Sequence, residues 1–346
     1  MTPPENLMTK QRRATVYDIA RMAQVSQTTV SFVLNNTPNT SITEDTRARV
    51  LTAAETLGYR PNAMARALRT HQSSFIGFIT DFIATTPHAG RIVEGAQQAA
   101  WEQGRLLLLV NTGGDPALEA AALDVMIEQR AQAVIYATMY HREAAPPAGL
   151  RDLRSVLLDC YAADRGLPCV LPDDRQGGYD ATRALIDAGH RRIGFINNHS
   201  PIPATFARQA GYAQALADAG IPFDPDLVVS GDVRESECNY RVTQELMLRP
   251  NPPTALFVFC DQMVVGVYDA LRDMRLRIPE DVAVIGFDNL EIIAATLHPA
   301  LTTMALPHYE MGAWAVRYVL GQTPDLPADG PVQQLMPCPL VRRQSI

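Results

Sequence analysis

The segment between residues 14 and 58 alternates short amphipathic stretches with tight polar connections. Apolar side chains recur there at helical spacing in three sets: Val16, Ile19, Ala20 and Ala23, then Val30, Val33 and Leu34, then Val50, Leu51, Ala54 and Leu57. Ser26 and Thr43 are expected to cap the second and third helices, because a hydroxyl group there accepts a hydrogen bond from a free backbone N–H. The pattern predicts a helix, a turn, a helix, a loop and a third helix that ends before Gly58.

A proline break at residues 59–62 separates these helices from a run of good helix formers, Ala63–Thr70. An isolated helix of this length is not stable in water. We therefore expect it to fold only against a partner, which is either DNA or a second subunit.

From Phe75 onward, short β-rich apolar runs alternate with helical stretches. The runs form two series, residues 75–80, 106–111, 133–138 and 155–159, and then residues 192–197, 227–232, 255–260 and 282–287. This alternation predicts parallel sheets covered by helices, and the separation near Asp173 predicts two lobes with a cleft between them. Ligands bind at the carboxyl ends of such strands, so we expect a ligand at the loops after Thr80, Asp173, Asn197, Cys260 and Phe287.

Charge is divided unevenly along the 346 residues, whose net charge is −7. Residues 10–71 hold nine basic and four acidic side chains, so the remainder of the chain carries the negative charge. A basic N-terminal segment suits a phosphate backbone, whereas an acidic body would be repelled by it.

Several classes of protein are disfavoured by what the sequence lacks. It contains no HExxH, GxSxG, P-loop or strand-associated GxGxxG pattern, its seven histidines are scattered, and its five cysteines form no CxxC pair. We therefore expect no catalytic residues, no metal site and no cofactor. Purely apolar runs such as Leu106–Val110 are too short to span a bilayer, and the first twenty residues lack the apolar stretch of a secretion signal. A cytoplasmic protein is the expectation.

Two segments carry a family resemblance. TVYDIARMAQVSQTTVSFVLN resembles the DNA-binding head of the lactose-repressor family, and RPNAMARALRT is similar to that family's hinge. The doubly wound body in the same order extends the resemblance to nearly the whole chain. It implies an all-α helix-turn-helix head at 1–60, a hinge at 61–73, and an effector-binding and dimerisation domain at 74–346. That domain would have two periplasmic-binding-protein-like α/β lobes, one formed by about 74–173 and 304–332, the other by 174–303 and 333–346.

The resemblance also implies which residues meet DNA. Base-reading side chains in the major groove would be Gln27, Thr28 and Phe32, although phenylalanine cannot hydrogen-bond a base and can only touch a thymine methyl. The phosphate-contacting set would be Thr15, Tyr17, Ser26, Thr29, Ser31 and Asn35. In the hinge, Leu68 would wedge between bases in the minor groove, and the other contacting residues would be Asn62, Ala65 and Arg69. The alternatives are an exposed polar face for Thr28, Thr29 and Ser31, and core packing for Phe32 and Leu68.

The same resemblance implies a set of effector-binding residues in the body. Arg208 would clamp ligand oxygen atoms, Asp288 and Asp173 would accept hydrogen bonds from hydroxyl groups, and further members would be Phe82, Cys260 and His308. The alternatives are a surface ion pair for Arg208, a helix cap for Asp173 or Asp288, and core packing for Phe82.

These features together predict a transcription repressor. We expect a homodimer that binds a pseudo-palindromic operator in double-stranded DNA and responds to a small-molecule effector, with a sugar as the favoured class. The alternatives are a solute-binding protein of a transporter, which would need an export signal and no basic head, and an enzyme on a doubly wound fold.

Overall fold

A computed structural model describes residues 14–34, 37, 40–59, 75–86, 89–323 and 330–346. The chain divides into two compact units, residues 1–73 and 74–346, which are described separately here. No helix in these described ranges is both long and apolar enough to cross a membrane.

The first unit contains three helices, α1 (Val16–Ala23), α2 (Gln27–Leu34) and α3 (Glu44–Thr56). Thr15 and Asp18 form a capping box at the start of α1. The backbone N–H of Thr29 donates to Ser26 Oγ at 3.0 Å, and that of Thr46 donates to Thr43 Oγ1 at 3.4 Å. Both predicted caps are therefore confirmed.

The core of this unit is small, and it consists of Ile19, Ala20, Ala23, Val30, Val33, Val50, Ala53 and Ala54. Leu51 and Leu57 repeat at helical spacing but lie outside this core, with exposures of 49% and 36%. Leu51 follows Val50 by one residue and so points away from the buried stripe, and Leu57 lies at the C-cap, beyond the last turn of α3.

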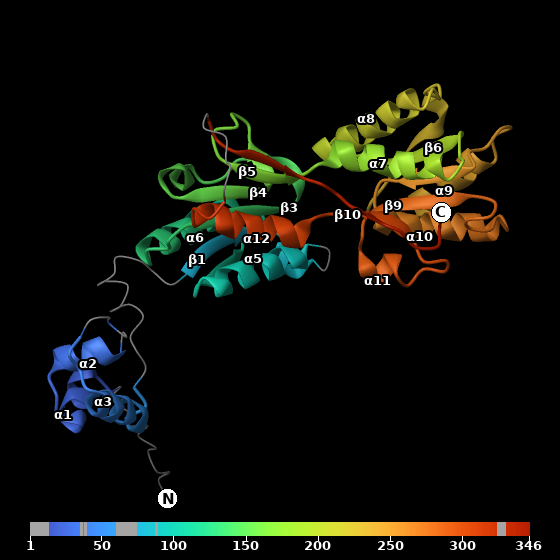
Figure 1. Cartoon of the computed structure of the whole chain (residues 1–346). Coiled ribbons are helices and arrows are strands. Elements are labelled where there is room, and N and C mark those ends of the chain that lie inside the picture. The colour runs from blue at the N-terminus through green and yellow to red at the C-terminus, as the bar shows by residue number, and fades with distance from the viewer. Residues whose placement is uncertain (1–13, 35–36, 38–39, 60–74, 87–88, 324–329) are drawn as a thin grey trace, which may run out of the picture. The chain divides into compact units, whose positions relative to one another are not determined.

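The first lobe of the second unit is built on a parallel sheet with strand order β11-β5-β4-β3-β1-β2. Its strands are β1 (Phe75–Thr80), β2 (Leu106–Asn111), β3 (Val134–Ala144), β4 (Ser155–Ala162), β5 (Cys169–Pro172) and β11 (Gln333–Met336). Helices α5 (Gly90–Glu102) and α12 (His308–Val319) lie side by side and share one hydrophobic core with the sheet, while α6 (Pro116–Glu128) shares another (Figure 1). Alternate residues of each central strand enter the two cores, as a sheet covered on both faces requires.

The second lobe has a sheet with the order β12-β10-β9-β8-β6-β7. Its strands are β6 (Ile193–Asn198), β7 (Val228–Gly231), β8 (Ala255–Val258), β9 (Ala283–Asp288), β10 (Thr302–Ala305) and β12 (Leu340–Val341), and only β12 pairs antiparallel. Helix α7 (Asp174–Asp187) packs on α8 (Pro203–Asp218), and α9 (Ser236–Met247) packs on α10 (Asp261–Asp273). The second lobe also contains the short helix α11 (Glu291–Ala294) and the 3-10 turn Pro225–Leu227. The 3-10 turns Ile83–Thr85 and Ala148–Asp152 belong to the first lobe.

The observed strand pairing differs from the expected lobe boundaries at two places. Strand β11 pairs with β5 and therefore belongs to the first lobe, although residues 333–346 were all expected in the second. Strand β10 pairs with β9, so the second lobe extends through Ala305 and not only to residue 303. Both strands have only four residues, and β11 reads QQLM without an apolar run, so the hydrophobic pattern could not assign them to a sheet.

Candidate functional site

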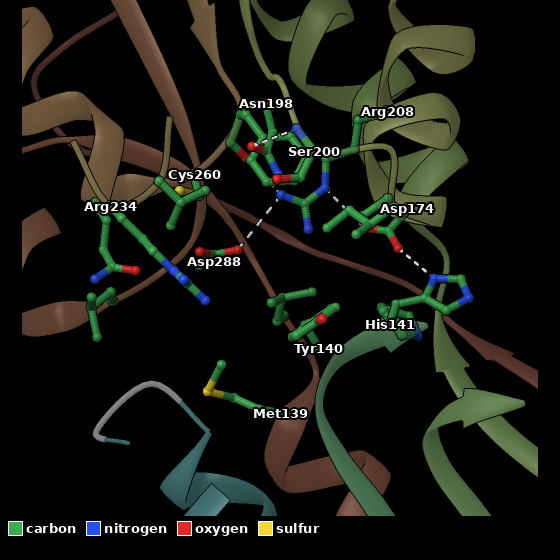
Figure 2. A pocket seen from close by; sticks show the side chains of 18 of the residues that line it. Met139, Tyr140, His141, Asp174, Asn198, Ser200, Arg208, Arg234, Cys260 and Asp288 are labelled. Carbon is green, nitrogen blue, oxygen red and sulfur yellow. Dashed lines mark hydrogen bonds and ion pairs between the residues drawn. The ribbon is translucent and has the colours of Figure 1, made fainter. Parts of the chain in front are cut away.

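A cavity of about 620 Å³ lies between the two lobes of the second unit. The first lobe contributes Thr86, Met139, Tyr140, His141 and Asp159, and the second contributes most of the remaining lining (Figure 2). The lining residues from the second sheet follow the ends of β6, β7, β8 and β9. The cavity therefore lies at the carboxyl ends of parallel strands, where the sheet topology places ligands.

A chain of polar side chains crosses this cavity, in which Asp174 and Arg208 are buried and His141 and Asp288 are partly buried. Arg208 Nε donates to Asp174 Oδ1 at 2.9 Å, and Arg208 Nη1 lies 3.7 Å from Asp288 Oδ1. The other oxygen of Asp174 lies 2.9 Å from His141 Nδ1 (Figure 2). His141 belongs to β3 of the first lobe and Asp174 to α7 of the second, so this contact joins the two lobes.

The packing of α7 on α8 brings Asp174 and Arg208 together. A Cβ atom at Gly178 would collide with the backbone of Arg208, and one at Gly211 would collide with the backbone of Arg175. Glycine at both positions therefore allows the two helices to approach closely. The Arg208 guanidinium also stacks on the Phe287 ring, 3.6 Å from its centroid, and Nη1 donates to the Phe259 carbonyl at 2.6 Å.

The charged forms of this pair are stabilised by each other. Burial raises the pKa of Asp174, but Arg208 and His141 outweigh burial and hold that pKa below its ordinary value. Burial lowers the pKa of Arg208, but Asp174 and Asp288 outweigh it and produce a net rise. Both groups are therefore ionised, as expected for a buried and hydrogen-bonded pair.

Asp159 differs from Asp174 because it lacks a cationic partner. Its side chain is buried, and Oδ1 has no hydrogen-bond partner among the described residues. Burial raises its pKa to about 7, and nearby His141 only partly opposes this rise. Asp159 also has a φ of 57°, a left-handed conformation that costs free energy for any residue except glycine. A buried polar atom without a partner in a cavity wall is available to a ligand or to an ordered water molecule.

Asp288 is positioned by the loop that follows β9. Asp288 and Asn289 both have positive φ values, 108° and 54°. Asp261 holds this loop, because one carboxylate oxygen accepts from the Leu290 backbone N–H at 2.7 Å and the other accepts from Thr303 Oγ1 at 2.7 Å. Burial, with Asp288 nearby, raises the pKa of Asp261 well above its ordinary range.

Comparisons with known proteins connect this site to a family. Residues 15–62 match the bacterial regulatory proteins of the lacI family, and residues 182–346 match the periplasmic binding protein-like domain. The HTH-type transcriptional regulator GalR of Escherichia coli is 33% identical over 338 residues, which are 96% of each chain. The HTH-type transcriptional repressor PurR of Photobacterium profundum is 30% identical, over 96% of this chain and 98% of the relative. This chain belongs to the lacI family.

Solved structures agree with this assignment. A LacI-family transcriptional regulator from Rhizobium etli has 31% identity and a TM-score of 0.72, over 79% of this chain and 99% of that one. The complex of the transcriptional regulator CelR with cellobiose has 26% identity and a TM-score of 0.62, over 96% of this chain and 100% of that one. The predicted fold class is confirmed, and the lacI-family protein described here is a DNA-binding transcriptional regulator.

The structure brings three of the six predicted effector residues of this lacI-family protein into the cavity wall, namely Arg208, Cys260 and Asp288. Asp173 instead caps α7, where it accepts from the Gln176 backbone N–H at 3.0 Å, so the cap alternative describes it. Phe82 is 47% exposed and His308 is buried at the start of α12, and neither lines the cavity.

Asp174, Asp159 and His141 also line the cavity, although none of them was predicted from the sequence. Asp174 directly follows the predicted Asp173, so only a shift of one residue separates the prediction from the cavity. Asp159 is the last residue of the apolar run at 155–159, which predicts a strand but gives no sign of a ligand contact. No local signal marks His141.

In the DNA-binding head, the predicted contacts within the described ranges lie on α1, on α2 or at their starts. Gln27 and Thr28 are exposed, and Phe32 is 39% exposed, so core packing does not account for Phe32. Tyr17 is 58% exposed, while Ser26 and Thr29 share a side-chain hydrogen bond of 2.9 Å. The remaining predicted contacts Asn35, Asn62, Ala65, Leu68 and Arg69 lie outside the described residues.

Proposed function

We propose that this lacI-family protein is a repressor whose operator affinity is set by a small polyhydroxylated metabolite in the interlobe cavity. The observation that carries the proposal is the chain of contacts His141–Asp174–Arg208–Asp288, which joins the first lobe to the second across the cavity. A ligand that binds there touches both lobes and can bias their relative position. The relatives are named as transcriptional regulators, so they support neither alternative, a transport protein or an enzyme.

The exposed face of α2 supports sequence-specific binding to operator DNA. Gln27, Thr28 and Phe32 are exposed there, on a helix fixed by a Ser26 cap and by buried Val30 and Val33. A rigid helix with exposed side chains can enter the major groove and contact base edges. We assign base reading to these three residues and phosphate contact to the predicted set that includes Tyr17 and Thr29. We propose the cytoplasm as the place where the protein works, because a regulator of this kind must reach operator DNA.

The cavity chemistry supports a carbohydrate as the effector class. Asp288 and Arg208 offer acceptors and donors for hydroxyl groups, and Phe259 and Tyr140 offer rings for an apolar sugar face. CelR, 26% identical to this chain, has been solved with cellobiose.

A homodimer is supported by exposed apolar side chains on the first lobe. Leu106 and Leu108 are 53% and 37% exposed on the edge strand β2, and Leu118 and Val125 are 44% and 49% exposed on α6. Apolar surface that a folded domain leaves exposed is suited to an interface with another chain. Two copies joined in this way would present two heads to a pseudo-palindromic operator.

The test is selection of bound fragments from the host's genomic DNA, followed by titration of the best fragment with purified protein. We expect a DNA site with two-fold symmetry and a protein dimer in analytical ultracentrifugation. We also expect the affinity of the protein for this DNA to change when a sugar is added that raises the melting temperature of the protein. Bound sequences without symmetry, or affinity that no cavity ligand alters, would refute the proposal.

A further inference from the structure

The cavity carries an excess of acidic groups that limits which effectors it can accept. We infer that the effector is an uncharged polyhydroxy compound, and that the cavity excludes the corresponding sugar phosphates and sugar acids. This inference rests on the proposed function and narrows its ligand class. The described residues that line the cavity include four acidic side chains, Asp159, Asp174, Asp232 and Asp288, and two arginines, Arg208 and Arg234. Two histidines also line it, and His141 lies against Asp174 and His199 against Asp232.

Arg208 cannot serve as an open anion site, because its charge is already balanced. Its Nε donates to Asp174 at 2.9 Å, and its Nη1 lies 2.6 Å from the Phe259 carbonyl and 3.7 Å from Asp288. Its face is covered by the Phe287 ring. An anionic ligand would therefore meet one arginine together with two carboxylates, whereas a hydroxyl group can donate to Asp288 and accept from the free Arg208 Nη2.

Asp159 adds to this selectivity at the first-lobe side of the cavity. Its Oδ1 is buried and lacks a hydrogen-bond partner in the described part of the chain, and it belongs to the cavity lining. A neutral hydroxyl group can pair with this oxygen, whether the carboxyl is protonated or not. A phosphate or carboxylate at the same place would be repelled by the ionised form, and no cationic side chain of the described residues donates a hydrogen bond to this oxygen.

The positive charge of the second arginine, Arg234, compensates little of the negative charge of these carboxylates. Arg234 is exposed in the loop after β7, and its backbone N–H donates to Asp232 Oδ1 at 2.7 Å. Solvent screens a charge in this position much more than a charge in the buried part of the cavity. The negative charge therefore dominates where the ligand is most enclosed.

The experiment is isothermal titration of the full-length protein with matched pairs. Glucose, galactose and ribose are each compared with their phosphate ester and their sugar acid, and cellobiose and maltose complete the neutral set. We expect at least one neutral sugar to bind, and its charged counterparts to bind on the order of 100-fold more weakly, as one unbalanced carboxylate near the ligand would produce.

Two variants connect that discrimination to the cavity. Asp174→Asn removes one of the carboxylates that balance Arg208, so it should reduce the neutral-to-anionic ratio about tenfold. Asp159 is only partly ionised near pH 7, so Asp159→Asn should reach a reduction of this size only when binding is measured well above that pH. Asp159→Asn keeps the result interpretable if Asp174→Asn does not fold. The matched control is Asp281→Asn, which removes one negative charge from a surface pair with Arg277 on the same lobe and should leave the ratio unchanged.

The outcomes separate this inference from the proposed function. If a sugar phosphate or sugar acid binds as tightly as its neutral sugar, the inference that the effector is uncharged is wrong. If that anion also alters the affinity for operator DNA, the proposed function as an effector-controlled regulator is still supported. Absence of binding by every neutral sugar also overturns the inference. If, in addition, no compound in the set changes DNA affinity, the effector part of the proposed function fails with it.

Discussion

The DNA-binding head and the second lobe of the body place their functional groups in opposite environments. The head has a core of small side chains, with Ile19 as the largest buried residue of its described part, and its predicted base-reading residues Gln27, Thr28 and Phe32 are exposed. The second lobe has a core with stacked rings such as Phe195 and Phe257, 4.5 Å apart, and its functional groups are buried ions such as Asp174 and Arg208. The comparison teaches that in the head stability and function can be changed separately, whereas in the cavity one residue serves both.

The largest effect is expected from Asp174→Ala. This change leaves the buried guanidinium of Arg208 without its closest carboxylate, and breaking a buried pair from one side costs about 3–5 kcal/mol. Urea unfolding followed by circular dichroism measures the loss. Asp173→Ala is the matched control, since it removes a helix cap and should cost about 1 kcal/mol. Equal losses from the two changes would contradict the buried-ion description of the cavity.

Ile19→Ala should unfold the head while the body stays folded. Ile19 is fully buried, and deletion of such a side chain costs about 3 kcal/mol, a large share of the stability of so small a core. Hydrogen exchange read by mass spectrometry should show lost protection in peptides from residues 14–59 only. Met22→Ala, at an exposed position on the same helix, is the control. Protection lost throughout the body would show that the two units do not fold independently.

A pH effect should distinguish Asp159 from the paired acids. Its pKa is raised from the ordinary value to about 7, so the folded state holds a proton that the unfolded state has already released. Stability from this group is therefore complete at low pH and falls as pH rises, by about 2 kcal/mol between pH 5 and pH 7. The stability difference between wild type and Asp159→Asn should show this slope. A difference that does not vary with pH would place Asp159 in a more polar environment than the structure does.

The smallest effect is expected from Thr15→Ala at the start of α1. Thr15 Oγ1 accepts from the Asp18 backbone N–H at 3.3 Å and Asp18 accepts in return, so loss of this capping box should destabilise the head by about 1 kcal/mol. Exchange rates of α1 amides measure it. Thr28→Ala, at an exposed position within α2, should leave them unchanged. An effect of similar size from both changes would argue against the cap.

Local patterns were sufficient to predict the head, because its helices depend on spacing and on caps within a few residues. Ser26 and Thr43 cap as predicted, while Leu51 shows that apolar character alone does not reveal which side a residue occupies. In the body, the long apolar runs predicted both sheets, but four-residue strands such as β10 and β11 gave no such signal.

The cavity could be predicted only in part. Arg208, Cys260 and Asp288 were predicted from the family resemblance and lie in its wall. His141 and Asp174 are 33 residues apart and meet only because the two lobes fold against each other, so no local pattern reveals their contact. The same holds for the unpaired oxygen of Asp159, which depends on what surrounds it in three dimensions.

The central claim is that ligand binding in the cavity changes the affinity of the DNA-binding head for operator DNA. The most direct measurement is the fluorescence anisotropy of a labelled operator, titrated with protein at zero and at saturating concentrations of a neutral sugar that binds the cavity. We predict that the operator Kd changes at least about 5-fold, and that operator changes the sugar Kd by the same factor, because coupling is reciprocal. An operator Kd that stays the same with the cavity saturated would contradict the claim.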